Sequence, residues 1–233
     1  MNKETNLDRI REWAKAILYI DIKETGTPFI ASHPFTSSWF TMGENGKVMD
    51  LHDPEALQKW REELKQQIDE ADLIQLFLHL NSPYILTFLK NTWMHMSADD
   101  LGTILNNFWR MQENISGDKN ITATEIVTMF KTANKETLMD EEERERYAAL
   151  PDMITVYRGV TDHNKGKKEA FSWTTDKKIA EWFANRFDTG TGEIWMLTVP
   201  KKRVLCAFGG EEKELIVNLY GFGGIKEMII EKI

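Results

Sequence analysis

Residues 170–187 read AFSWTTDKKIAEWFANRF, and this stretch decides the fold class. Residues 171–174 alternate between apolar and hydroxyl side chains, as in a short strand with two faces. The remainder repeats its apolar residues at helical spacing, with Thr175 or Asp176 available as the N-cap. The predicted apolar face of this helix consists of Ile179, Ala180, Phe183, Ala184 and Phe187.

Short runs rich in β-branched and aromatic residues surround this helix. We expect strands at 154–160, 170–174, 193–199, 203–208, 215–220 and 225–232. Each run is bounded by Gly, Pro, Asp or Lys, which is typical of strand ends. One helix among such strands favours an α+β fold over a doubly wound parallel sheet.

The residues before position 150 are mainly helical in pattern. Apolar residues three or four apart predict helices at 7–17, 54–71, 73–80, 83–93, 97–111 and 122–133. The acidic run 140–146 predicts a further helix with a solvated face, and 28–42 predicts a hairpin or an ordered loop. Trp93, Met94 and Trp109 are expected in the core. We therefore expect a mostly helical region, 1–150, followed by a β-rich core, 151–233.

The bulk properties limit the class of protein. The net charge is −8, and the acidic excess falls on residues 1–150, which disfavours promiscuous nucleic-acid binding. The single cysteine, Cys206, allows no disulfide within the chain, so a reducing compartment is expected. The sequence has no signal-peptide pattern and no apolar run of membrane-spanning length. We expect a cytoplasmic protein without a membrane partner.

A charged residue interrupts the first strand of the β-rich core. Val156-Tyr157-Arg158-Gly159-Val160 places an arginine inside an apolar run, and a buried cation requires an anionic partner. In a purely structural pair that partner is a carboxylate, Glu212 or Glu214. In a binding site it is a phosphate, which a planar guanidinium binds in bidentate fashion.

Two further polar segments follow in the same core. In Phe171-Ser172-Trp173-Thr174, strand alternation places Ser172 and Thr174 on one face, although Thr174 also suits a helix cap. In 209–217, GGEEKELIV, Glu212 and Glu214 are expected on one strand face about 7 Å apart. Two converging carboxylates suit chemistry that passes through an oxocarbenium-like sugar. The structural alternative is an ordinary acidic turn.

Taken in this order, the strand-borne arginine, the Ser-x-Thr before a helix and the Glu-x-Glu opening a strand resemble the Arg–Ser–Glu class of ADP-ribosyltransferases. The resemblance covers roughly residues 150–233. Gly159, Ala180, Phe183 and Ala184 also fit the family pattern around the first two motifs. It implies an ADP-ribosyltransferase-like catalytic core and a mono-ADP-ribosyltransferase of the bacterial or phage toxin or effector type, with NAD as co-substrate and no metal.

The resemblance implies a role for each NAD-contacting residue. Arg158 would bind the NAD pyrophosphate, and the backbone of Gly159 would hydrogen-bond the nicotinamide carboxamide. Ser172 would position the site strands and the nicotinamide ribose, with Thr174 in support. The middle motif reads Ser-Trp-Thr where the family often has Ser-Thr-Ser, and this variation keeps the leading hydroxyl.

The resemblance also assigns the two glutamates. Glu214 would accept a hydrogen bond from the ribose 2′-hydroxyl and stabilise the positive charge that develops as nicotinamide leaves. Glu212 would orient or deprotonate the incoming nucleophile. Phe183 or Phe187 would flank the nicotinamide, unless both are core residues.

The implied acceptor is a macromolecule, protein in preference to nucleic acid, and the Glu-x-Glu pair suggests arginine. A neutralising antitoxin or immunity protein would fit as a second partner. The loop 208–211, which helps to select the target in the family, is short and leaves the target open. Transfer to RNA or DNA, NAD hydrolysis and an inactive binding module that keeps the fold are the alternatives.

The histidines offer no competing site. His33 is a candidate to line the site from the N-terminal half, but it lies beside aromatic residues and is expected to be structural. The other histidines lack metal-ligand spacing, and with one cysteine in the chain we predict no metal site.

Overall fold

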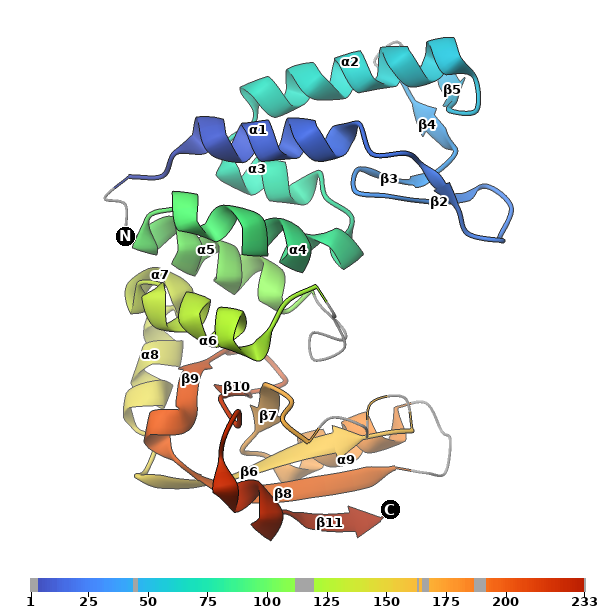
Figure 1. Cartoon of the computed structure of the whole chain (residues 1–233). Helices are drawn as coiled ribbons and strands as arrows, with labels where there is room; N and C mark the ends of the chain where they lie inside the picture. The colour runs from blue at the N-terminus through green and yellow to red at the C-terminus, as the bar shows by residue number, and fades with distance from the viewer. Residues whose placement is uncertain are drawn as a thin grey trace. The chain divides into compact units, whose positions relative to one another are not determined.

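The computed structural model describes residues 4–43, 46–111, 120–162, 164, 168–186 and 192–232. Its contacts divide the chain into two compact units, Met1–Ser97 and Ala98–Ile233. Helices and antiparallel sheets occur in both units, so the predicted mixed α+β class is confirmed (Figure 1).

The described residues of unit 1 form four α-helices and two small antiparallel sheets. The helices are α1 (Leu7–Leu18), α2 (Pro54–Glu70), α3 (Leu73–Leu78) and α4 (Ser82–Thr92), followed by a 3-10 turn, η1 (Trp93–His95). The strands are β1 (Lys23–Glu24), β2 (Ile30–His33), β3 (Thr36–Ser38), β4 (Phe40–Met42) and β5 (Val48–Asp50). Strands β2 and β3 form the hairpin expected within 28–42. Met94 is 59% exposed, so its predicted core position is wrong.

Unit 2 begins with helices that the sequence assigned to the other half. These are α5 (Ala98–Trp109), α6 (Ala123–Thr132), α7 (Lys135–Leu138) and α8 (Glu141–Ala148). Both α6 and α8 contact strand β9 (Val204–Ala207), beside which they lie in Figure 1. The predicted boundary after residue 150 therefore falls inside unit 2, because these helices pack in the same compact unit as the sheet.

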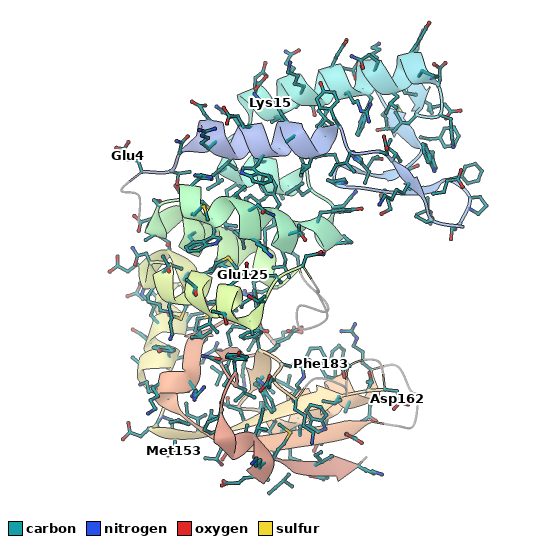
Figure 2. All side chains as sticks on the ribbon, viewed as in Figure 1. Glu4, Lys15, Glu125, Met153, Asp162 and Phe183 are labelled. Carbon is teal, nitrogen blue, oxygen red and sulfur yellow. The ribbon has the colours of Figure 1, made fainter. Side chains whose placement is uncertain are left out.

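The remaining strands of unit 2 form one antiparallel sheet in the order β11-β8-β6-β7-β10-β9. Their bounds are β6 (Met153–Val160), β7 (Ser172–Thr174), β8 (Glu193–Pro200), β10 (Glu214–Val217) and β11 (Ile229–Lys232). All six predicted strands are present, most of them shorter than expected. Met153 and Asp162, labelled in Figure 2, mark the start of β6 and the residues just after its end.

Helix α9 (Lys177–Asn185) packs on β6 and also contacts β7 and β8. Its N-cap is Asp176, whose carboxylate accepts a hydrogen bond from the Lys178 amide at 3.0 Å. Asp176 is one of the two residues predicted for this position. The helix lies very close to the sheet at Gly159. A Cβ there would come within 2.1 Å of the Ala180 carbonyl oxygen and 2.7 Å of the Phe183 Cβ. Only glycine allows this packing.

Burial in unit 2 follows the alternation along the central strands. Val156 and Val160 on β6 are buried, as are Leu197 and Trp195 opposite Val156 and Arg158 on β8. Because Arg158 stands two residues from both Val156 and Val160, it lies on the same, apolar face of the strand. Among the described residues, no helix is both long enough and apolar enough to cross a membrane.

Candidate functional site

The site lies where three strands run side by side at the middle of the unit 2 sheet. Strand β7 pairs with β6 on one side and with β10 on the other. The register places Thr174 opposite both Tyr157 and Glu214, and Ser172 opposite Ile216. Arg158 follows Tyr157 directly, so the three motifs recognised in the sequence meet across neighbouring strands.

Hydrogen bonds connect the three central residues. The Arg158 Nη1 donates a hydrogen bond to the backbone carbonyl of Ser172 at 2.6 Å. The Ser172 hydroxyl donates a short hydrogen bond to Oε1 of Glu214. Among the described residues, no ion pair joins Arg158 to Glu212 or Glu214. The purely structural interpretation of Arg158 predicted such a carboxylate partner, but the guanidinium donates to a backbone oxygen instead.

Arg158 keeps unused donor capacity in this position. Its Nε is buried and has no hydrogen-bond partner among the described residues. Burial lowers the pKa of the guanidinium to about 10, and the nearby negative charge of Glu214 opposes that shift. The side chain is thus still a cation at neutral pH, and one of its buried N–H groups has no partner among the described residues.

Glu214 is a buried carboxyl, 9% exposed, with its charge set by its neighbours. Burial raises its pKa, and the charge of Glu212 raises it further. The hydrogen bond from Ser172, the charge of Arg110 and the indole N–H of Trp109 act in the opposite direction. Glu214 therefore ionises less readily than an exposed glutamate, yet its ionised form has donors and cations beside it.

Glu212 lies in a turn, not on a strand face with Glu214 as predicted. The turn is tight: Gly210 has φ +77° and Lys213 has φ +45°, a left-handed conformation that a lysine rarely adopts. Strand β10 begins only at Glu214, so the strand spacing of about 7 Å does not apply to the pair. Glu212 is exposed, and it remains near enough to raise the pKa of Glu214.

Thr174 and Gly159 both make structural contacts with helix α9 or the turn that leads into it. The Thr174 hydroxyl accepts a hydrogen bond from the Asp176 amide at 3.1 Å, which forms the turn into α9. Gly159 provides the close approach of the same helix, as described above. Phe183, labelled in Figure 2, lies on that helix and is half-buried. Phe187, the other aromatic expected near nicotinamide, falls outside the described residues.

Three site neighbours lie outside the three motifs. Trp109 was expected only as a core residue; it is 2% exposed, and its ring lies edge-on to Phe130 and to Phe171, next to Ser172. Its Nε1 lies near Glu214 without forming a hydrogen bond to any described residue. Arg110 follows it in the chain and forms an ion pair with Glu143 of α8.

The helix predicted from the acidic run 140–146 is present with a solvated face that carries Glu141, Glu142 and Glu145, but Glu143 lies on its buried side. The residue is 2% exposed. Asp140 and Glu143 form a capping box, whose Asp-x-x-Glu spacing is visible in the sequence and could have placed Glu143 in the first turn of the helix. That spacing does not reveal which side of the helix the sheet covers.

His33 belongs to unit 1. It is buried, its Nδ1 accepts a hydrogen bond from the Phe35 amide at 3.1 Å, and its ring packs edge-on to Trp60. Burial lowers its pKa to about 4, so the ring is neutral at pH 7. The described His, Cys, Asp and Glu side chains form no group of three that could hold a metal ion.

No protein-family model, curated protein or solved structure matches this chain. The residues themselves are therefore the basis for a functional proposal. They combine a cation with a free N–H, a hydroxyl and a buried carboxylate within a few contacts of one another. Such a set can bind an anionic group beside a hydroxyl-bearing group and can stabilise a positive charge that develops between them.

Proposed function

We propose that this chain cleaves nicotinamide from NAD and transfers the ADP-ribose to a macromolecular acceptor. The observation that carries the proposal is the continuous contact from Arg158 through Ser172 to Glu214 across three adjacent strands. The three residue types occur in the order and strand context that resemble ADP-ribosyltransferases, and the fold brings them into one place.

The Arg158 side chain fits the pyrophosphate of NAD. Nη1 is occupied by the Ser172 carbonyl, which fixes the guanidinium plane, whereas the buried Nε has no partner. A phosphate oxygen would satisfy that donor and neutralise the buried cation. Gly159 would offer its backbone to the nicotinamide carboxamide, in addition to its packing against α9.

Glu214 would act on the ribose. As the bond between C1′ and the nicotinamide nitrogen breaks, its electron pair leaves with nicotinamide, which departs uncharged. The ribose then carries a positive charge that a carboxylate in a partly water-excluded site stabilises strongly. The Ser172 hydroxyl holds Oε1 of Glu214 in place, and the other carboxylate oxygen would accept a hydrogen bond from the ribose 2′-hydroxyl.

Glu212 would serve the second half of the reaction. The acceptor nucleophile forms a bond to C1′ and loses a proton, and the exposed carboxylate of Glu212, whose charge acts on Glu214, would receive that proton. An acceptor on a protein, with arginine as one candidate, fits a cytoplasmic toxin or effector that a neutralising partner would restrain. Transfer to nucleic acid and hydrolysis by water use the same first step.

The acceptor class is tested with labelled NAD. The protein is incubated with NAD labelled in its adenylate part and a cell lysate, and aliquots are then treated with protease or nuclease. We expect label on macromolecules that protease releases and nuclease does not. Glu214→Gln should abolish the labelling, and Glu227→Gln, an exposed glutamate elsewhere in the unit, should leave it unchanged.

Two other outcomes redirect the proposal. Label released only by nuclease assigns the acceptor to nucleic acid, and nicotinamide release without any labelled macromolecule assigns the activity to NAD hydrolysis. Absence of nicotinamide release from the unmodified protein rejects NAD cleavage altogether.

A further inference from the structure

The chain just before the Glu212 turn is held by helices of the same unit. Arg146 of α8 donates a short hydrogen bond to the Phe208 carbonyl. Glu143, also of α8, accepts a short hydrogen bond from the Gly209 amide. The Arg110 guanidinium lies over the Phe208 ring, 4.8 Å from its centre. Two successive residues are thus fixed from the helical side.

Glu143 is the central residue of these contacts. Its side chain is 3% exposed, and a carboxylate at such a depth is costly unless both oxygens have partners. Oε1 accepts from Gly209 and from Arg110, and Oε2 accepts from the Asp140 amide at 3.0 Å. The last bond belongs to the capping box of α8, so the carboxylate is anchored to its own helix as well.

Gly209 is shaped for this contact. A Cβ on Gly209 would lie 3.0 Å from Oε1 and 3.3 Å from Cγ of Glu143, so a larger residue would push the carboxylate away. The far end of the turn is held as well, because the Lys213 ammonium lies 3.5 Å from the Asp176 carboxylate at the start of α9. Glu212 therefore stands on a short turn with both ends anchored.

We propose that Glu143 is a positioning residue of the site, which holds Gly209 and through it the 210–213 turn, so that the Glu212 carboxylate stays beside Glu214. Its effect on catalysis rests on the proposed function, because it acts through Glu212 and Glu214. It also gives the helices of 98–150 a part in the site that the sequence left open.

The first test measures the turn itself and needs no enzymatic activity. Amide hydrogen exchange is followed by mass spectrometry on peptides that cover 208–214. Glu143→Ala should raise exchange there by about tenfold or more. Glu142→Ala, on the exposed side of the same helix, should leave it unchanged. If Glu143→Ala does not fold, Glu143→Gln, which keeps the shape and one acceptor, should show a smaller rise. Unchanged exchange in the variant that folds overturns the proposal.

The second test measures the coupling of Glu143 to Glu212. Ser172, Arg110, Trp109 and Arg158 also interact with the Glu214 carboxyl. A change in one single variant would therefore not show that Glu143 acts through Glu212, and a double-mutant cycle is needed. The quantity measured is the pH, on the acid side of the pH–rate profile, at which the rate of nicotinamide release falls to half of its maximum. This pH is called the acid-side half-point.

In the unmodified background, Glu212→Gln should move this half-point to lower pH, because a negative neighbour is lost. In the Glu143→Gln background the same change should have a clearly smaller effect, because the turn no longer holds Glu212 in place. Equal shifts in both backgrounds overturn the positioning role. If no nicotinamide is released by the unmodified protein, the proposed function fails while hydrogen exchange still decides whether Glu143 holds the turn.

Discussion

The Ser172 hydroxyl on β7 donates its hydrogen bond to Oε1 of Glu214 on the neighbouring strand β10. Glu214 stands opposite Thr174, two residues further along β7, so the bond runs diagonally across the strand pair. A hydroxyl that donates to a carboxylate favours the ionised form, and here it opposes the effect of burial. The Ser172 hydroxyl is therefore one of the neighbours that set the protonation state of the proposed catalytic carboxylate.

Replacing that hydroxyl should move the pH dependence of NAD cleavage. In Ser172→Ala the stabilisation of the ionised form is lost, so the pKa of Glu214 rises. The acid-side half-point of nicotinamide release should then move to higher pH. Ser172→Thr keeps a hydroxyl and is the control. A half-point that stays in place, or moves to lower pH, in Ser172→Ala contradicts the assigned direction of the bond.

Arg158 should not tolerate lysine. A lysine keeps the charge but lacks the planar fork that uses one N–H on the Ser172 carbonyl and leaves Nε for a phosphate. We expect Arg158→Lys to weaken NAD binding by about tenfold or more, measured by calorimetry with Glu214→Gln present in both proteins to prevent turnover. Equal affinity of the arginine and lysine proteins would show that Arg158 has only a structural role.

Gly159 should be required for the full stability of the fold, whatever the activity. A methyl group there meets the Ala180 carbonyl at 2.1 Å and the Ala184 amide at 2.6 Å, so α9 must move away from β6. Overpacking of this kind costs about 1–3 kcal/mol and sometimes more. Urea unfolding should report that loss for Gly159→Ala, and Gly223→Ala, where a Cβ meets nothing within 4 Å, should change little. Similar stability of both variants would rule out the tight packing.

Burial of Glu214 should make the fold less stable as the carboxyl ionises. Its pKa is raised in the folded state, so its contribution to stability is present at low pH and is lost as pH rises through the folded pKa. Glu214→Gln removes this dependence. The melting temperature of the variant relative to the unmodified protein should therefore increase between acidic and neutral pH. A relative decrease over that range would contradict the sign.

The parts of the fold with strong periodicity could be predicted from the sequence. The helix after Asp176 and the strand that carries Arg158 have clear patterns of 3.6 and 2 residues, and both are present. The short helix α7 was missed, because four residues are too few to show a period. The unit boundary was misplaced because it depends on which surfaces pack together, here α6 and α8 on β9.

The sequence was enough to predict which residues form the candidate site, but not most of the contacts between them. The order of the motifs identified Arg158, Ser172 and Glu214, but strand register decides that Arg158 donates to a backbone carbonyl. Glu212 was predicted on a strand because the sequence gives no sign that Lys213 has a positive φ. A lysine rarely adopts that conformation, so the turn before Glu214 could not be predicted from it. The burial of Glu143 also escaped prediction, since an acidic run normally faces solvent and only the tertiary contact with Gly209 and Arg110 offsets its burial.

The central claim is NAD cleavage by the Arg158, Ser172 and Glu214 site, and the rate of nicotinamide release from NAD by the purified protein tests it most directly. We predict measurable release that falls by about 10²–10³-fold in Glu214→Gln, since loss of one group that stabilises transition-state charge costs about 2.7–4 kcal/mol. The melting temperature of the variant at neutral pH should be equal or higher. No release by the unmodified protein, or equal release by the variant, would contradict the claim.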